Sequence, residues 1–175
     1  MFAKHVFIAS LVGLLCAVAA FPQAAEKRVS PHETITATLA GKQVTITYGR
    51  PSVKGRKIFG ELVPFGKVWR TGADEATELN TETMLDIRGL TVPPGRYSLY
   101  TLPGEEKFLL IVNKETGQSG MSYDASQDLG RVEMDILHTP PTEQLTIALL
   151  SVIEKKAVLH IGWENTQVSV PISAK

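Results

Sequence analysis

The chain has 175 residues, and its 18 basic and 18 acidic residues give a formal net charge of zero at pH 7. This balance excludes a general electrostatic attraction to nucleic acids or to anionic membranes, so any recognition of charge must be local. The single cysteine, Cys16, excludes a scaffold held by disulfides within the chain.

Residues 1–25 have the three-part layout of a secretory signal peptide. Lys4 and His5 precede an uncharged apolar run, Val6–Ala20, and small residues follow it. The run has about fifteen residues and is shorter than the roughly twenty that cross a bilayer as a helix. We therefore predict an exported protein, periplasmic or secreted, that keeps no membrane segment and no cysteine after cleavage. The candidate cleavage positions follow Ala19, Ala20 and Ala25.

The remaining residues, 26–175, predict a single domain. About 150 residues is an ordinary domain size, and such a domain buries about two-thirds of its unfolded surface, so it needs no disulfide to fold. No repeat, linker or low-complexity tract divides this part of the chain. Removal of Lys4 leaves 17 basic and 18 acidic residues, which keeps the balance of charge.

Alternation of apolar and polar residues dominates from Glu33 onward, as is typical of strands with one buried face. The stretch "TITATLAGKQVTITYG" predicts two strands joined by a turn at Gly41, and "ATELNTETMLDIRG" predicts two more. In "LTVPPGRYSLYTLPG" a Pro-Pro-Gly turn directly precedes a strand rich in tyrosine and leucine. The continuous apolar run of "KFLLIVNKETG" is typical of a strand buried on both faces.

The last third of the chain predicts four further strands. They are "RVEMDILH", "EQLTIALLSV", "AVLHIGWE" and "TQVSVPIS". No apolar period of 3.6 residues persists through twelve residues, and only "KIFGELVP", residues 57–64, is a candidate for a short helical turn. About ten short strands with regular turn signals predict an all-β domain, a β-sandwich with a flattened barrel as the alternative.

The stretch "YGRPSVKGRKIFGELVPFGKVWRTGADEAT", Tyr48–Thr77, departs from this alternation. It contains six cations and five glycines, and Glu61 is its only acid before Asp74. Its interspersed hydrophobic residues would not stay in water, so we expect the Arg50–Glu75 segment to fold back as a long ordered loop over one end of the sandwich. These hydrophobic residues are Ile58, Phe59, Leu62, Val63, Phe65, Val68 and Trp69.

Two interpretations of this loop are open. The loop could only cap the fold, with its arginines paired to carboxylates, such as Arg70 to Asp74 or Glu75. Alternatively, convergent guanidinium groups could hold a carboxylate, phosphate or sulfate, with Trp69 or Tyr48 as an apolar wall. Both interpretations could hold at once.

No catalytic residue can be assigned from the sequence. "GQSG", Gly117–Gly120, lacks one residue of the nucleophile-elbow pattern. His160 alternates with apolar neighbours and is most simply a solvent-side strand residue, and His138 is most simply a strand end. His32, in "SPHET", is the least explained histidine.

Metal and cofactor motifs are weak. No His-x-His or His-x-x-x-His pair occurs, and Glu61 stands where a P-loop requires its lysine. Asp124–Asp135 has acids at calcium-loop positions, but its glycine falls one position late, so a polar surface loop explains it better and calcium is left open. We predict no metal site and no cofactor.

The long cationic stretch, together with "SPHET", "VPPGRYSLYTLPG", "NKETGQSG", "DASQDLGR" and "WENTQVSVPI", resembles the exported bacterial family called domain of unknown function 2911. The resemblance runs from about Ser30 to the C-terminus. It implies a secreted or periplasmic, β-rich single domain, and it implies no activity. It also supports one constellation formed by Arg50, Lys54, Arg56, Trp69, Arg70, Thr71 and Glu75.

Our leading hypothesis is a periplasmic binding module for a small anionic or polar ligand. One alternative is a hydrolase in which His32 and Glu33 or Glu75 form an acid–base pair, and another is an envelope protein whose exposed strand edges pair with a protein partner. The candidate ligand-binding residues are His32, Arg50, Lys54, Arg56, Trp69, Arg70, Thr71 and Glu75.

Overall fold

The computed structural model describes residues 28–175, and the predicted signal peptide lies outside these residues. The described residues form nine strands and one 3-10 helix, and none of their helices has the length and apolarity needed to span a bilayer. The elements are β1 (His32–Leu39), β2 (Lys42–Gly49), β3 (Thr77–Thr81), β4 (Leu85–Ile87), β5 (Leu90–Val92), β6 (Gly95–Leu102), β7 (Phe108–Asn113), η1 (Ala125–Gln127), β8 (Asp128–Ile153) and β9 (Lys156–Ala174).

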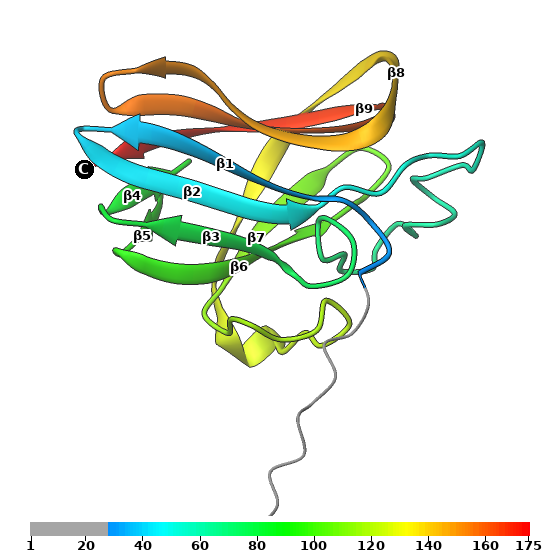
Figure 1. Ribbon diagram of the computed structural model, residues 1–175, viewed down its shortest axis with the longest axis horizontal. Helices are drawn as coiled ribbons and strands as arrows, with labels where there is room; N and C mark the ends of the chain where they lie inside the picture. The colour runs from blue at the N-terminus through cyan, green and yellow to red at the C-terminus, as the bar shows by residue number, and fades with distance from the viewer. Residues whose placement is uncertain (1–27) are drawn as a thin grey trace, which may run out of the picture.

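The strands form one continuous antiparallel sheet in the order β1-β2-β3-β6-β7-β8-β9-β4-β5. The sheet folds into two layers because β8 belongs to both: its residues up to Met134 pair with β7, and those from Asp135 pair with β9. Figure 1 shows the β8–β9 hairpin lying above the layer of β1, β2, β3 and β6. The predicted all-β sandwich is confirmed, and the sheet is not closed into a barrel.

The strand count differs from the expected ten for two reasons. Leu90–Val92 forms the extra strand β5, while the last four predicted strands merge into β8 and β9. The merger is possible because β8 takes up Pro140 and Pro141 in register shifts between His138 and Thr146, where a proline breaks no ladder hydrogen bond.

The predicted helical turn at residues 57–64 was placed wrongly. Phe59 and Val63 form an isolated bridge within a tight turn there, and the short helix lies at Ala125–Gln127 instead. The side chain of Asp124 caps this helix by accepting a hydrogen bond from the backbone N–H of Ser126.

The core lies between the layers and is built by alternate residues of the strands, such as Val44 and Ile46 of β2 and Leu159 and Ile161 of β9. Strand β7 is buried on both faces, as its apolar run predicts. The segment that follows β7 covers the outer face of β6, since the hydroxyl of Tyr100 donates to the carbonyl of Ser122.

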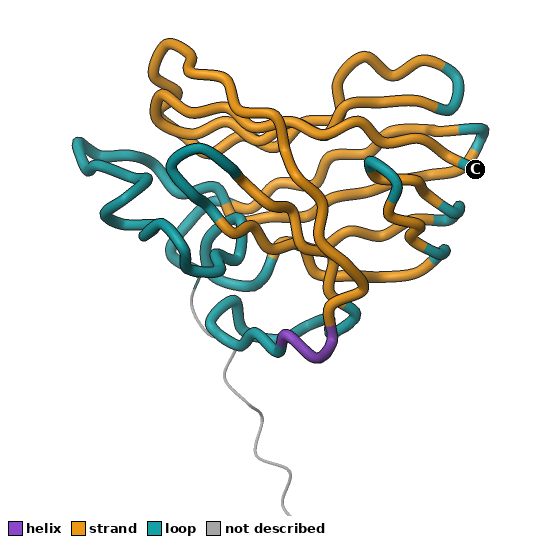
Figure 2. The backbone as a smooth tube through the Cα atoms, turned by 180° about the vertical axis from the view of Figure 1, so that it is seen from behind, coloured by secondary structure: helices purple, strands orange, loops and turns teal. Residues whose placement is uncertain are grey.

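The Arg50–Glu75 loop covers one end of this sandwich, as expected. It projects beyond the end of β2 in Figure 1 and is seen from behind, as a teal loop, in Figure 2. Isolated backbone bridges tie it down at three points: Ser52 to Gln144 of β8, Trp69 to Thr101 of β6, and Glu75 to Ser119.

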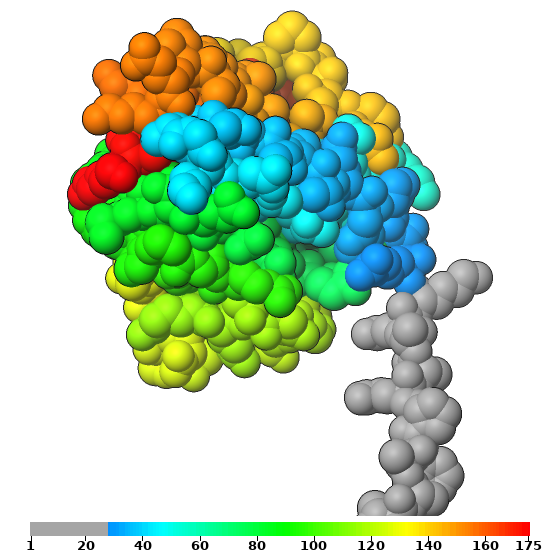
Figure 3. Space-filling view, turned by 60° about the vertical axis from the view of Figure 1, so that its left-hand side comes forward, coloured from blue at the N-terminus to red at the C-terminus, as the bar shows by residue number. Residues whose placement is uncertain are grey.

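Burial of the loop's hydrophobic residues follows the prediction with two exceptions. Ile58, Phe59 and Val63 join the core, whereas Leu62 and Phe65 stay 47% and 38% exposed. Figure 3 shows β1 and β2, in blue and cyan, lying between the orange β8–β9 hairpin and the green strands below.

Candidate functional site

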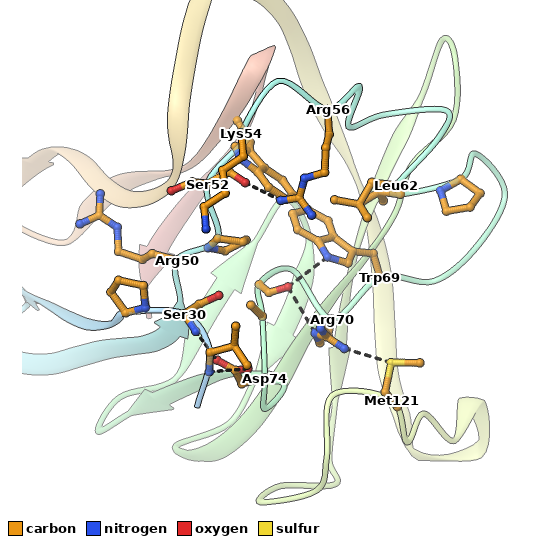
Figure 4. A pocket seen from close by; sticks show the side chains of 18 of the residues that line it. Ser30, Arg50, Ser52, Lys54, Arg56, Leu62, Trp69, Arg70, Asp74 and Met121 are labelled. Carbon is orange, nitrogen blue, oxygen red and sulfur yellow. Dashed lines mark hydrogen bonds between the residues drawn. The ribbon is translucent and has the colours of Figure 1, made fainter. Parts of the chain in front are cut away.

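A pocket of about 590 Å³ lies under the Arg50–Glu75 loop. The loop supplies most of its wall, the N-terminal segment 29–31 closes one side, and Trp163 of β9 and Met121 contribute from distant parts of the chain. Figure 4 shows the side chains of Arg56 and Arg70 beside the Trp69 indole. Five of the eight predicted residues line this pocket: Arg50, Lys54, Arg56, Trp69 and Arg70.

Aromatic rings form the inner wall of the pocket. The indoles of Trp69 and Trp163 stack with their centroids 5.7 Å apart and an interplanar angle of 18°. Phe59 packs edge-on against both indoles, at 6.0 and 6.5 Å. The backbone bridge to Thr101 and the hydrogen bond from Trp69 Nε1 to the carbonyl of Gly72 hold the half-buried Trp69 ring in place.

The guanidinium of Arg50 is already used by the protein. It pairs with Glu33 at 3.1 Å and donates to the carbonyl of Leu145 and the hydroxyl of Thr146 on β8. In Figure 4 this side chain is directed away from Trp69. The interpretation of the loop as a cap held by arginine–carboxylate pairs therefore applies to Arg50.

Arg56 and Arg70 behave differently. Arg56 donates to the carbonyls of Ser52 and Val53 in its own turn, at 2.5 and 2.9 Å. Arg70 donates to the carbonyl of Gly72 and to the sulfur of Met121. Neither guanidinium forms an ion pair with a carboxylate of residues 28–175, so the expected pairing of Arg70 with Asp74 or Glu75 is wrong.

The pocket lining therefore has an excess of positive charge. Lys54 and Lys67 also line it, and within the described residues neither ammonium is within ion-pair distance of a carboxylate. Among residues 28–175, Asp74 is the only acid in the lining. We conclude that four cations face or border this pocket without a carboxylate of the described chain to neutralise them: Lys54, Arg56, Lys67 and Arg70.

Asp74 fastens the N-terminal segment to the loop, a role that the sequence analysis missed. Its carboxylate accepts hydrogen bonds from the backbone N–H groups of Val29 and Ser30 and lies 3.2 Å from Nε2 of His32. Burial alone would raise the pKa of Asp74, but these hydrogen bonds outweigh it and lower the pKa below its ordinary value of 3.8. The carboxylate is thus ionised and already occupied by donors.

His32 and Glu75 lie outside this pocket, in a neighbouring one of about 230 Å³. Nε2 of His32 is 3.2 Å from Asp74 and 3.4 Å from Glu75, so Asp74 stands between the two pockets. Burial would raise the pKa of Glu75, but Arg28 and His32 lower it. Glu33 is not a partner of His32, because adjacent strand residues point to opposite faces.

Tyr48 does not form the apolar wall that we expected for the cationic pocket. It lines the smaller pocket instead, and its buried hydroxyl donates to Glu33 at 2.7 Å and accepts from the backbone N–H of Ile147. Burial, together with Glu33, raises the pKa of Tyr48 to about 12. Its role in the described structure is to join β2 to β8.

Thr71 is fully buried and positions the loop without lining either pocket. Its φ of 56° is unusual for a β-branched residue, and hydrogen bonds hold this conformation. The Thr71 hydroxyl bonds to the carbonyl of Trp69 and the hydroxyl of Thr101, and the hydroxyl of Thr77 donates to the carbonyl of Thr71. These hydrogen bonds also fix the backbone of the two adjacent residues, Arg70 and Gly72.

Two glycines allow the loop to approach the sheet closely. A Cβ on Gly49 would lie 2.2 Å from the carbonyl oxygen of Ala73, and a Cβ on Gly120 would lie 2.1 Å from Cδ of Arg70. No larger residue fits at either position without moving the loop. The need for glycine at both positions, like the place of Trp163 in the pocket, depends on contacts between residues that are distant in sequence.

The acids of Asp124–Asp135 do not gather into a calcium site. Asp128 binds Arg131 and the hydroxyl of Tyr123, whereas Asp135 pairs with Arg88 on another part of the surface. Within residues 28–175 no three histidine, cysteine, aspartate or glutamate side chains lie close enough to hold a metal ion together.

The family described as "Protein of unknown function (DUF2911)" matches residues 30–172. The chain belongs to this family. The matched range of DUF2911 includes the whole Arg50–Glu75 loop, His32 and Trp163, so the described residues that line the two pockets lie within it except Arg28 and Val29. No curated protein and no solved structure matches the chain significantly.

Proposed function

We propose that this DUF2911 protein is a binding module for a small anionic ligand, held in the pocket under the Arg50–Glu75 loop. The observation that carries the proposal is the charge of the lining. Arg56 and Arg70 extend from two parts of one loop to the same pocket, and no carboxylate of residues 28–175 pairs with either.

Physical chemistry favours an anion in such a place. Cations that border one pocket repel one another, and a bound carboxylate or phosphate relieves that repulsion while accepting hydrogen bonds from the guanidinium groups. The volume of about 590 Å³ also lies in the range of small-molecule sites. The indole wall adds apolar contact to this electrostatic attraction.

We further propose that the protein acts outside the cytoplasm, in the periplasm or as a secreted protein. Support comes from the sequence of residues 1–25, with its cationic start, apolar run and small residues. N-terminal sequencing of the protein recovered from the periplasm or the medium should give a chain that begins at Ala20, Phe21 or Glu26. Recovery of the full-length chain from the cytoplasm would contradict this proposal.

The binding proposal is tested by thermal unfolding in the presence of organic anions and inorganic anions. The panel contains benzoate, 2-naphthoate, citrate, galacturonate, phosphate and sulfate, with a neutral amide of each organic acid as the control. A ligand that binds only the folded state raises the melting temperature in proportion to the logarithm of its concentration. We expect at least one anion to raise the melting temperature and the amide of an organic anion to leave it unchanged. If none of the anions raises the melting temperature, the proposal is contradicted.

A charge-matched pair of variants locates the binding. Arg56→Gln with Arg70→Gln should abolish the anion-dependent rise in melting temperature. The control is Arg96→Gln with Lys107→Gln, because Arg96 pairs with Glu78, Lys107 pairs with Glu133, and neither cation lines the pocket, so this variant loses the same two charges elsewhere. Equal loss of response in both variants would show that the anion effect is nonspecific.

The hydrolase alternative rests on the contact between His32 and Glu75. It is less favoured, because among residues 28–175 Nε2 of His32 meets only carboxylates and bonds to no serine or threonine hydroxyl that it could activate. If His32 is catalytic, His32→Ala should abolish hydrolysis of ester, phosphate or glycoside substrates without lowering the melting temperature. The alternative of an envelope partner at a strand edge has no specific contact in its favour.

A further inference from the structure

Few side chains among the described residues of the cationic pocket can accept a hydrogen bond, and the protein itself uses the acceptors that lie near the guanidinium groups. The carboxylate of Asp74 accepts from two backbone N–H groups and faces His32. The carbonyl of Gly72 accepts from both Trp69 Nε1 and Arg70 Nε, which uses both of its lone pairs. The carbonyl of Ser52 accepts from Arg56. Among the side chains of the described lining, only the hydroxyls of Ser30 and Ser52 can both donate and accept a hydrogen bond.

Donors, in contrast, remain available in the same lining. Arg56 uses Nε and Nη2 within the described residues, and Arg70 uses Nε and Nη1, so each retains a nitrogen for a ligand. The ammonium groups of Lys54 and Lys67 add further donors at the rim. The side chains of the described lining are therefore rich in donors and poor in acceptors.

The apolar part of the lining is flat. Trp69 is backed by Trp163, with the two planes inclined by only 18°, and Phe59 supports both rings from the side. In the view of Figure 4 the Trp69 indole lies between the side chains of Arg56 and Arg70. A flat ligand that contacts the Trp69 indole would thus have its edge close to a guanidinium group.

On the basis of the proposed anion-binding function, we propose that the ligand is an aromatic carboxylate. Its ring would pack against the Trp69 indole, and its carboxylate, which accepts hydrogen bonds and donates none, would be bound by Arg56 or Arg70. This class matches both properties of the pocket, the flat apolar wall and the surplus of donors.

The shortage of acceptors is what distinguishes this class from a sugar acid. An indole also packs on the C–H face of a sugar, so the aromatic wall alone would fit either ligand. Each sugar hydroxyl, however, carries a hydrogen that needs an acceptor once it leaves water, and a buried donor without one weakens binding. An inorganic anion such as phosphate meets the guanidinium groups but leaves the aromatic wall unused.

The inference is tested by calorimetric titration of the unmodified protein with four ligands. These are 2-naphthoate, its saturated analogue decahydro-2-naphthoate, galacturonate and inorganic phosphate. We expect 2-naphthoate to bind about 3- to 10-fold more tightly than the saturated analogue, which has the same carbon skeleton and charge but no flat ring. It should bind at least 10-fold more tightly than galacturonate or phosphate.

The outcomes separate the two proposals. Galacturonate or phosphate binding as tightly as 2-naphthoate would overturn the aromatic-carboxylate inference and leave the anion-binding function standing. Binding of none of the four would contradict both. Trp69→Leu should remove the preference for 2-naphthoate over its saturated analogue, and Trp69→Phe should retain it. The ligand comparison on the unmodified protein decides the inference even if Trp69→Leu does not fold.

Discussion

Arg50→Gln and Arg56→Gln remove the same charge from the same pocket, yet we expect only the first to destabilise the protein. Arg50 is 25% exposed and has three partners, and its loss leaves the carbonyl of Leu145 and the hydroxyl of Thr146 without a donor. A part-buried acceptor left unsatisfied costs about 1–3 kcal/mol. The lost ion pair adds little, because Glu33 is 39% exposed.

Arg56 is exposed and bonds only to carbonyls of its own turn, which water can reach once the guanidinium is gone. We therefore expect about 2 kcal/mol of lost stability for Arg50→Gln and at most about 0.5 kcal/mol for Arg56→Gln. For a domain of this size these values correspond to a fall in melting temperature of about 4–8 °C and less than about 2 °C.

The assay is urea unfolding followed by tryptophan fluorescence, with the free energy of unfolding extrapolated to zero denaturant. Both tryptophans of the chain, Trp69 and Trp163, line the pocket, so the signal reports on the region that the substitutions change. Equal destabilisation by the two substitutions would refute the reasoning, because it would mean that Arg56, like Arg50, holds the loop in place.

Three further predictions concern the loop. Burial opposes the shift, but hydrogen bonding lowers the pKa of Asp74 below its ordinary value of 3.8. The ionised carboxylate therefore stabilises the fold above pH 3.8, and this contribution is lost as the pH falls through the lowered pKa of the folded state. In urea unfolding between about pH 6 and 3, Asp74→Asn should accordingly show a weaker pH dependence of the free energy of unfolding than the unmodified protein. Gly49→Ala should cost about 1–3 kcal/mol in the same assay, because its Cβ would meet the carbonyl of Ala73; an unchanged stability would show that the loop can move away. Thr71→Val should lower the free energy of unfolding by about 1–2 kcal/mol through loss of its bonds to Trp69 and Thr101, and a smaller effect would mean that the loop does not depend on that hydroxyl.

The strands could be predicted from the sequence because alternation is a local property. Ile35 to Leu39 and Val44 to Tyr48 show it within a few residues, and β1 and β2 lie where it predicts. The merger of four short strands into β8 and β9 could not be predicted in this way. Prolines at positions 140 and 141 normally end a strand, and only the partner strand determines that a register shift takes them up.

The candidate site was predicted in part, for a related reason. The hydrophobic residues around Arg56 and Arg70 had to leave water, and this alone places the cationic loop against the sandwich. Trp163 could not be assigned to the pocket, because its place depends on how β9 packs under the loop. The partner of Arg70 was predicted wrongly because nearness in sequence does not fix side-chain direction. Asp74 has a φ of 64°, and its carboxylate contacts the N-terminal segment at Ser30 and not the guanidinium of Arg70.

The central claim, that Arg56 and Arg70 are free to hold an anion while Arg50 is not, is tested most directly by nuclear magnetic resonance of the arginine Nε–Hε groups during titration with 2-naphthoate. The signals of Arg56 and Arg70 should shift with a common dissociation constant, and that of Arg50, fixed by Glu33 and β8, should stay in place. A shift of the Arg50 signal alone, or no shift of any of the three, would contradict the account.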